Sequence, residues 1–383
     1  MHRRLSQLLS IIAASLALST AHAADPIRIG TVLSITGAAS YIGDPEAKTL
    51  QMYVDQINAA GGVIGRKLEL VTYDDGSDAN KARTLATRLT ERDNVVVMIG
   101  GSTTGTTMAM IPVFEGAQIP FMSLAGSVNI VEPVRKYVFK SPHTDRMGCE
   151  KIFADMKKRN FTKIALIAGT DGFGTSMREQ CLKVVGNYGI QILIDQTYGA
   201  ADTDMTPQLT KVKGTPGVQA IMNTGASGQG AAVLTRNYGQ LGMTNIPMYQ
   251  NSGVASKAYI ELSGPAAEGV RLPAAALLVA DKLPAGDPQK PVVIGYTTTF
   301  EKSAKQPVST FGGGAYDGLM MVVAAIKHAN SAEPEKIRDA IEQTKGFVGT
   351  AGVVNLSPTD HLGLKVDAFR MVEVKAGDWL LVD

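Results

Sequence analysis

Residues 27–78 read IRIGTVLSITGAASYIGDPEAKTLQMYVDQINAAGGVIGRKLELVTYDDGSD. A short apolar run comes first, followed by a loop rich in Gly and Ser, an amphipathic segment, a Gly-rich turn and a second apolar run. In residues 44–60 the apolar side chains recur at helical spacing, and the segment ends at Gly61-Gly62. This order predicts a strand, a helix and a strand, the opening unit of a parallel α/β sheet.

The alternation continues to about residue 140 and then restarts. Asp78 is placed to cap the next helix, and 95–99 is a continuous apolar run, as expected for a strand covered by helices on both faces. A parallel sheet is therefore expected in each of two units. The first unit has strands at 67–73, 95–99 and 118–122 and a helix at 105–116; the second has strands at 163–168, 190–197, 218–223 and 247–250 and helices at 144–159, 174–188, 205–213, 227–241 and 255–262.

The last third of the chain breaks this pattern. Beyond Val270 we expect helices at 288–304, 313–329 and 334–343, then strands near 349–355 and 366–374. A single open sheet rarely ends in this way, and 383 residues exceed the ~250 of a usual single core. We therefore predict two lobes joined by three crossings, which form a hinge. The crossings are expected at 141–143, 271–276 and 345–349, with lobe 1 at 24–141 plus 274–347 and lobe 2 at 142–273 plus 348–383.

The N-terminus has the features of a secretory signal peptide, residues 1–23. Arg3 and Arg4 precede an apolar stretch at 5–18, and Ala21-His-Ala23 is a small-x-small cleavage site. We expect a mature chain that starts at Ala24, is exported to the periplasm and is not embedded in a membrane, since no later stretch has ~18 uninterrupted apolar residues.

Composition argues against nucleic acid as a partner. The chain has 37 Lys and Arg against 35 Asp and Glu, and the signal peptide removes two Arg. A neutral mature protein lacks the positive charge that binding to nucleic acid or anionic lipid requires. We expect a monomer without a cofactor, and the scattered His and Cys show no metal-ligand spacing.

The two cysteines, Cys149 and Cys181, leave two interpretations open. They fall in helices on either side of the strand at 163–168, and an oxidising compartment favours a disulfide between them. Alternatively, both are buried thiols that pack as small hydrophobic groups.

Two loops after predicted strands carry small hydrogen-bond donors. They are Gly100-Gly-Ser-Thr-Thr-Gly-Thr-Thr107, which includes Thr103 and Thr104, and Ser123-Leu-Ala-Gly-Ser127. Ligands of open α/β sheets bind beyond the carboxyl ends of strands, and hydroxyls with free N–H groups at a helix start suit a carboxylate. Ordinary helix capping is the alternative for either loop. Two such loops on neighbouring strands favour binding.

Three further loop features are candidates for the cleft. Phe173 lies in Asp171-Gly-Phe-Gly174 and Tyr41 in the first strand–helix loop, where aromatic residues often form pocket walls. A hydrophobic staple for Phe173 and a solvent-facing position for Tyr41 are the alternatives. The loop Gly225-Ala-Ser-Gly-Gln-Gly230, with Ala226, has no Lys-Ser/Thr after it and is interpreted as a flexible cleft loop, not a phosphate site.

No catalytic constellation is present. The sequence contains no G-x-S-x-G, no H-E-x-x-H and no Cys beside a His motif, and the acidic pair Asp74-Asp75 ends a strand before a capped helix. We therefore expect a protein that is not an enzyme.

These segments resemble a known family. IRIGTVLSITGAASYIGD, INAAGGVIGRKLELVTYDDGSD, VVVMIGGSTTGTT and IPFMSLAGS occur in the order and spacing of the Leu/Ile/Val-binding family of type I periplasmic binding proteins of ABC importers. The resemblance implies two Rossmann-like lobes joined by a three-segment hinge, with the ligand enclosed between them and passed to a membrane permease. By position, the implied ligand contacts are Thr104 for the carboxylate, with Thr103 beside it, the backbone of Ala125, with Gly126 beside it, the hydroxyl of Ser127, and the aromatic rings of Tyr41 and Phe173.

One position departs from the family. Amino-acid binders carry an acidic residue after the strand corresponding to 247–250, where it pairs with the ligand's ammonium, and here Ser252 stands in that place next to Asn251. An enclosed ammonium without an anion would cost several kcal/mol. The hypothesis is therefore a small carboxylate without an α-amino group, an aromatic or other hydrophobic acid, with Asn251 or Ser252 at its far end. A branched-chain or other aliphatic amino acid, or a role as a ligand-sensing module, is the alternative.

Overall fold

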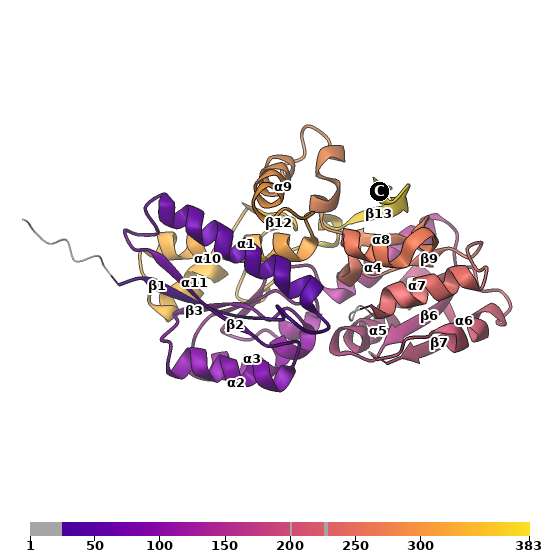
Figure 1. Ribbon diagram of the computed structural model, residues 1–383, viewed down its shortest axis with the longest axis horizontal. Coiled ribbons are helices and arrows are strands. Elements are labelled where there is room, and N and C mark those ends of the chain that lie inside the picture. Colours follow the sequence, from indigo (N-terminus) through magenta and orange to yellow (C-terminus); the bar gives the residue numbers. More distant parts are fainter. Residues whose placement is uncertain (1–24, 200, 226–228) are drawn as a thin grey trace, which may run out of the picture.

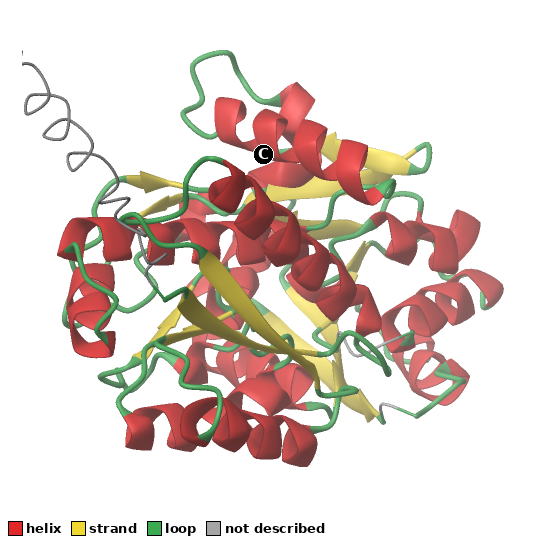
Figure 2. Ribbon diagram, turned by 60° about the vertical axis from the view of Figure 1, so that its left-hand side comes forward, coloured by secondary structure: helices red, strands yellow, loops and turns green. Residues whose placement is uncertain are grey.

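The computed structural model describes residues 25–199, 201–225 and 229–383. Two lobes lie side by side, and each is built on a sheet with helices packed on its faces (Figure 1, Figure 2). The predicted α/β architecture with two parallel-type sheets is confirmed. The predicted signal peptide, residues 1–23, lies outside the described residues.

The first lobe contains a five-stranded sheet and the helices packed on it. Its elements are β1 (Ile27–Leu33), α1 (Ser40–Ala59), β2 (Leu68–Asp74), α2 (Ala79–Glu91), β3 (Val97–Gly100), α3 (Thr104–Ala117), β4 (Phe121–Ser123), β5 (Val138–Lys140), α10 (Thr310–Ala329) and α11 (Pro334–Glu342). The spatial order is β2-β1-β3-β4-β5, and all neighbours are parallel. Helices α1, α10 and α11 lie on one face, and α2 and α3 lie on the other (Figure 1).

The opening stretch forms β1, α1 and β2 as predicted. Helix α2 begins where Asp78 accepts a hydrogen bond from the N–H of Lys81. Helix α1 begins at Ser40, four residues earlier than expected. Its first turn lies against the end of β1, since a Cβ at Gly43 would come within 2.3 Å of the Ser34 carbonyl. The helix can therefore start within the Gly/Ser-rich loop.

The second lobe contains a seven-stranded sheet. Its elements are α4 (Asp145–Lys158), β6 (Lys163–Gly169), α5 (Gly172–Val184), β7 (Gln191–Tyr198), α6 (Thr206–Lys213), β8 (Ala220–Asn223), α7 (Gly230–Gln240), β9 (Met248–Tyr249), α8 (Lys257–Ser263), β10 (Arg271–Ala274), β13 (Arg370–Lys375) and β14 (Asp378–Leu381). The order is β14-β13-β10-β9-β8-β6-β7. Strands β13 and β14 are antiparallel to their neighbours, so this sheet is mixed and not wholly parallel as expected.

The segment 271–276, where we expected a crossing, begins with a strand that was not predicted. Residues 271–274 form β10, an inner strand between β9 and β13. Pro273 lies in this strand, and Pro ordinarily argues against an inner strand because it lacks the N–H that the ladder needs. Strand β5, Val138–Lys140, was also not predicted.

The chain passes between the two sheets three times. It leaves the first sheet after β5, returns after β10, and leaves again between α11 and β13. Helix α9 (Lys290–Ala304) buries Val293 and Phe300 with side chains of the second sheet. In the last passage, β11 (Phe347–Val348) and β12 (Val353–Val354) form a two-stranded hairpin. The exact lobe boundaries stay a prediction.

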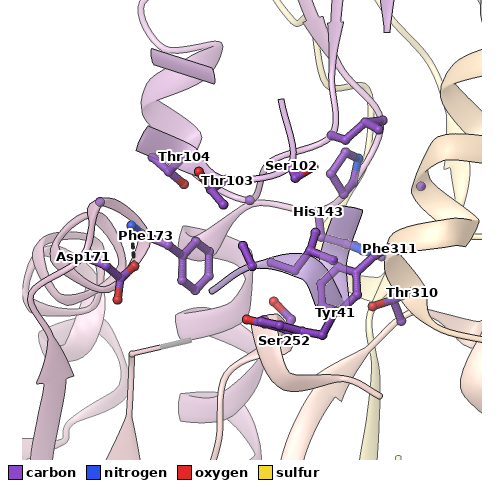
Figure 3. A pocket seen from close by; sticks show the side chains of 18 of the residues that line it. Tyr41, Ser102, Thr103, Thr104, His143, Asp171, Phe173, Ser252, Thr310 and Phe311 are labelled. Carbon is purple, nitrogen blue, oxygen red and sulfur yellow. Dashed lines mark hydrogen bonds between the residues drawn. The ribbon is translucent and has the colours of Figure 1, made fainter. Parts of the chain in front are cut away.

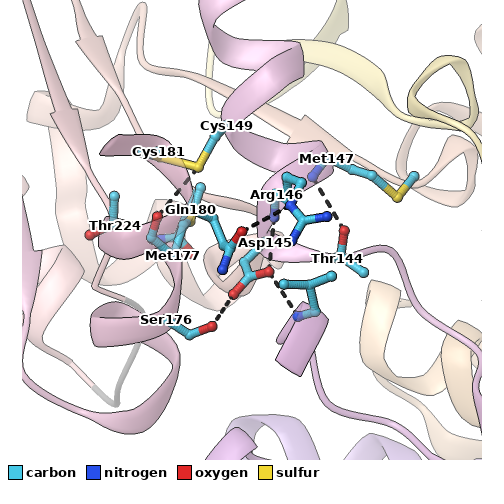
Figure 4. The surroundings of a disulfide bond; sticks show 12 residues. Thr144, Asp145, Arg146, Met147, Cys149, Ser176, Met177, Gln180, Cys181 and Thr224 are labelled. Atoms are coloured by element: carbon cyan, nitrogen blue, oxygen red, sulfur yellow. Dashed lines mark hydrogen bonds between the residues drawn. A yellow bond between two sulfur atoms is a disulfide. The ribbon is translucent and has the colours of Figure 1, made fainter. Parts of the chain in front are cut away.

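Cys149 of α4 and Cys181 of α5 are joined in a disulfide, with their Cα atoms 5.2 Å apart (Figure 4). Both residues are fully buried in a cluster that includes Ile152 and Met177. The bond ties together two helices that already pack against each other. Of the two interpretations that the sequence left open, the structure adopts the bridged one.

Candidate functional site

A cavity of about 340 Å³ lies between the lobes (Figure 3). Its walls come from loops after β1, β3 and β4 of the first lobe and from the loops after β6 and β9 of the second. The carboxyl ends of parallel strands face it, which is the ligand-binding edge of open α/β sheets. Its volume falls in the range of small-molecule sites. Six of the predicted site residues line it: Tyr41, Thr103, Thr104, Gly126, Phe173 and Ser252.

The loop before α3 presents the start of a helix, with one unsatisfied hydroxyl, to the cavity. Thr103 caps the helix, and its hydroxyl accepts from the N–H of Thr106 while Thr106 reaches back to the N–H of Thr103. Thr104 is the first helical residue, and its Oγ1 is buried without a partner among the described residues. Such a hydroxyl at a helix N-terminus, where the backbone dipole favours negative charge, suits an anion.

Aromatic rings form much of the apolar wall. Tyr41 on α1 and Phe311 on α10 meet edge to face, with centroids 5.7 Å apart. Phe173 reaches across from the second lobe, and a Cβ at Gly126 would lie 2.6 Å from its ring. At the same edge of the cavity, a Cβ at Gly172 would lie 3.3 Å from the N atom of Gly105. The lobes are thus in contact around the cavity.

His143 and Phe369 add a wall from the crossings between the lobes. The two rings stack, with centroids 3.7 Å apart and planes 15° from parallel. Burial, assisted by the nearby Lys140 ammonium, lowers the pKa of His143 to about 3, so the imidazole is neutral at physiological pH. No Lys or Arg is among the described residues that line the cavity. An anion there must be held by hydrogen bonds from neutral groups.

Asp171 is the one carboxyl group among the described lining residues. It caps α5, and its Oδ1 accepts the N–H groups of Phe173 at 3.0 Å and Gly174 at 3.1 Å. Its Oδ2 is buried and has no partner among the described residues. This oxygen is available to accept a hydrogen bond from a cationic group of a ligand at the second-lobe edge of the cavity.

Three predicted contacts do not line the cavity. The hydroxyl of Ser127 lies 2.6 Å from that of Ser176 and accepts the N–H of Asn129, so two of its three hydrogen-bonding positions are used within the protein. The N–H of Ala125 donates to Ser123 Oγ at 3.2 Å. Asn251 caps the turn at Gly253 and donates to the carbonyl of Gly225, which turns it away from the cavity. The predicted contact at Ala226 lies outside the described residues.

Several lining residues were not predicted. They are Ser102, His143, Asp171, Thr310, Phe311 and Phe369. His143 lies within the predicted crossing 141–143, and a hinge strand beside a cleft is a signal that could have identified it. Phe311 and Phe369 come from segments more than 200 residues away from the first hydroxyl loop, and only the folded chain brings them to it.

A family model described as periplasmic binding protein matches residues 26–378. The chain belongs to this family. It is 26% identical over 343 residues to the leucine-, isoleucine-, valine-, threonine-, and alanine-binding protein of Pseudomonas aeruginosa, and the match covers 88% of each chain. The predicted membership of the Leu/Ile/Val-binding class is thereby confirmed.

Solved structures of other proteins share the fold of this chain. An extracellular ligand-binding receptor from Rhodopseudomonas palustris HaA2 is 26% identical, with a TM-score of 0.86 and coverage of 93% of this chain and 99% of that one. A branched-chain amino acid transporter substrate binding protein from Streptococcus pneumoniae, in complex with isoleucine, is 22% identical, with a TM-score of 0.81 and coverage of 93% and 99%. At that identity the second likeness concerns the fold alone.

The family is one of periplasmic substrate-binding proteins. Among the described residues, no helix has the length and apolar character needed to cross a membrane. In the same part of the chain, no cluster of three or more His, Cys, Asp or Glu is arranged to hold a metal ion.

Proposed function

We propose that this protein is the solute-binding component of an ABC importer and that it encloses a small hydrophobic carboxylate, with an aromatic acid favoured, between its lobes. Hinge closure sequesters the ligand and presents the closed protein to the membrane permease. The proposal rests on the lining of the cavity. On one side, Thr104 at the start of α3 has a hydroxyl without a partner among the described residues, and the rings of Tyr41, Phe173 and Phe311 supply an apolar wall.

The proposed ligand orientation follows from these walls. The carboxylate lies at Thr104, where each charge-assisted hydrogen bond contributes roughly 1.5–3 kcal/mol. The apolar body lies among the rings, where burial of apolar surface contributes about 25 cal/mol per Å². Ser252 lines the second-lobe side with a neutral hydroxyl where amino-acid binders of the family carry an acid. A ligand without an ammonium group therefore fits this side better.

A branched-chain amino acid is the second candidate, and Asp171 is the observation that favours it. Its buried Oδ2 without a partner could receive a ligand ammonium and take over the role of the missing acid at Ser252. The name of the Pseudomonas aeruginosa relative points in the same direction.

Matched ligands separate the two candidates. Leucine and 4-methylpentanoate differ only by the ammonium group, and benzoate represents the aromatic acids. Isothermal titration of the purified protein should give binding of benzoate and 4-methylpentanoate that is tighter than binding of leucine. Tight leucine binding that is lost in Asp171→Asn, a variant that keeps the helix cap, would establish the amino acid instead.

The role of Thr104 is tested by two substitutions. Thr104→Val keeps the shape and removes the donor, and we expect affinity for the bound acid to fall roughly 10- to 150-fold, from the loss of one charge-assisted hydrogen bond. Thr104→Ser keeps the hydroxyl and should retain most of the affinity. Equal affinity of the Val variant and the wild type would remove Thr104 from the site.

A further inference from the structure

Two buried carboxyl groups lie behind the first hydroxyl loop, outside the proposed ligand contacts. Glu46 of α1 and Asp75, which follows β2, both have 0% relative exposure. Ser102 links Glu46 to the cavity. Its side chain is one of those that line the cavity, and its Oγ lies 2.5 Å from Glu46 Oε2. The protonation state of Glu46 therefore bears on a group that the ligand meets.

The hydrogen-bonding capacity of Ser102 is nearly filled by the protein. A serine hydroxyl has one donor and two acceptor positions. The N–H of Ser34 occupies one acceptor position at 3.0 Å. Ser102 Oγ uses a second position in its bond to Glu46 Oε2, to which it donates; protonation of Glu46 at that oxygen would reverse the direction. One position remains for a ligand in the cavity, and its character depends on Glu46.

The two states of Glu46 give opposite results. When the carboxyl group is ionised it can only accept, so the Ser102 hydrogen points at Glu46 and a lone pair is left for the cavity. A lone pair repels a carboxylate. When Glu46 is protonated, its O–H donates to Ser102 Oγ, and the hydroxyl hydrogen of Ser102 is free to donate to the ligand.

The surroundings of Glu46 favour the protonated state. Burial raises its pKa well above the ordinary value, the hydrogen bond from Ser102 opposes this, and the nearby Asp75 carboxylate raises it further. Oε1 of Glu46 and Oδ2 of Asp75 have no partner among the described residues. Asp75 itself receives the hydroxyl of Ser34 at 2.7 Å, and Lys81 partly offsets its charge.

The other elements packed on this part of α1 contribute phenol groups, and α10 also carries the buried carboxyl group of Asp317, whose charge acts on Tyr296. Tyr296 of α9 lies 2.8 Å from Thr49 Oγ1, one helical turn from Glu46, and burial raises the pKa of this phenol. The ring of Tyr316 of α10 is tilted by 58° against the ring of Tyr53, two helical turns from Glu46. On the outer surface of α1, Asp44 and Lys48 pair with each other.

We propose that Glu46 sets the hydrogen-bond polarity of Ser102, so that a ligand carboxylate binds to this protein together with a proton held on Glu46. The idea rests on the proposed function, because it requires a carboxylate against the first lobe. Affinity should be constant while Glu46 is protonated in the free protein and should fall by about tenfold per pH unit once it ionises.

The test is isothermal titration with benzoate, and in parallel with leucine, between about pH 5 and about pH 9, the range in which buried glutamates titrate. Each pH is measured in two buffers of different ionisation enthalpy, which reports proton uptake directly. Glu46→Gln places an amide donor on Ser102 at every pH, so we expect affinity that is retained and independent of pH. Asp44→Asn, on the exposed face of α1, is the control that should keep the wild-type slope.

Ser102→Ala is a second test of the coupling, and it stays informative even if Glu46→Gln does not fold. It should weaken binding and flatten the pH dependence. Infrared spectroscopy of the ligand-free protein at neutral pH adds a ligand-independent readout: the carbonyl band of protonated carboxyl groups should lose intensity in Glu46→Gln, in addition to the contribution of Asp317, which is unchanged in that variant. A slope that persists in Glu46→Gln or in Ser102→Ala overturns the proposal.

The titrations distinguish a loss of the coupling to Glu46 from a failure of the proposed function. If benzoate or leucine binds with the same affinity at every pH, the coupling to Glu46 is ruled out and the proposed function still stands. Absence of binding for both acids at every pH removes the proposed function, and the coupling with it.

Discussion

The hydroxyl oxygens of Ser127 and Ser176 lie 2.6 Å apart, although one follows β4 of the first lobe and the other belongs to α5 of the second. Ser176 also donates to Asp145, and the other oxygen of that carboxylate accepts the N–H of Val128 at 2.8 Å. Two of these bonds, Ser127 to Ser176 and Val128 to Asp145, join the lobes beside the cavity, in the surroundings of the disulfide (Figure 4). They are contacts that separation of the lobes would break.

Ser127→Ala should weaken ligand binding without a direct contact to the ligand. The variant loses a hydrogen bond of about 0.5–1.5 kcal/mol that exists only when the lobes are together, which corresponds to a roughly 2- to 10-fold loss of affinity in a titration. Thr84→Ala, in which the lost hydroxyl bonds only to its own helix, is the control. Unchanged affinity would mean that this contact does not stabilise closure.

Gly126→Ala should damage the site while leaving the fold intact. Its Cβ would lie 2.6 Å from the ring of Phe173, so the ring must move out of the cavity wall. Overpacking of this kind costs about 1–3 kcal/mol, and we expect affinity to fall by at least about fivefold. Gly116→Ala on α3, where a Cβ meets nothing within 4 Å, should bind normally. Equal affinities for the two variants would contradict the closed contact.

Reduction of the disulfide should destabilise the second lobe. Cys149 and Cys181 are 32 residues apart in sequence, and opening a loop of that size typically costs about 2–4 kcal/mol. Urea unfolding with and without a reductant measures the difference. The double variant Cys149→Ala, Cys181→Ala is the control, since a reductant should not alter its unfolding midpoint. A reductant effect of the same size in that variant would rule out the bridge as its cause.

Asp317 should make stability depend on pH. It accepts the N–H groups of Thr350 and Ala351 at the third crossing, and burial raises its pKa to about 7. The folded state keeps this proton to a higher pH than the unfolded chain, where an Asp has a pKa of about 3.9. Between these values the folded state binds more protons, so stability falls as pH rises and levels off above about pH 7.

The measurement is chemical denaturation of the wild type and Asp317→Asn at several pH values. The free energy of unfolding of the wild type, relative to the variant, should decline by up to about 4 kcal/mol between about pH 4 and about pH 7. Asp55→Asn, which removes an exposed carboxyl group from α1, controls for the loss of one titrating group. A constant difference between wild type and Asp317→Asn would contradict the assignment.

Local patterns were sufficient for most elements because each strand and helix carries its own periodicity. The helical spacing of Leu50 and Val54 predicted α1, and the apolar run at 95–99 predicted β3. Strand β10 was missed because Pro273 sits in an inner position where local rules disfavour it. Its place is determined by β9 and β13 on either side, which are neighbours in space only.

The residues of the candidate site also differ in whether the local sequence could identify them. Thr103, Thr104, Gly126 and Phe173 could be predicted, because parallel strands end at one edge and loops that follow them must lie near each other. The sequence could not show that Ser127 lies outside the cavity lining, because its hydroxyl meets Ser176 only when α5 packs against this loop.

By itself the sequence determined the alternation of strands and helices, the family and the hydroxyl loops, because these depend on residues close together in the chain. Tertiary structure alone decided that Cys149 meets Cys181, that His143 and Phe369 stack beside the cavity, and that Glu46 lies behind Ser102. Those pairings join segments 32 to 226 residues apart, and their geometry is set by how whole helices and lobes pack.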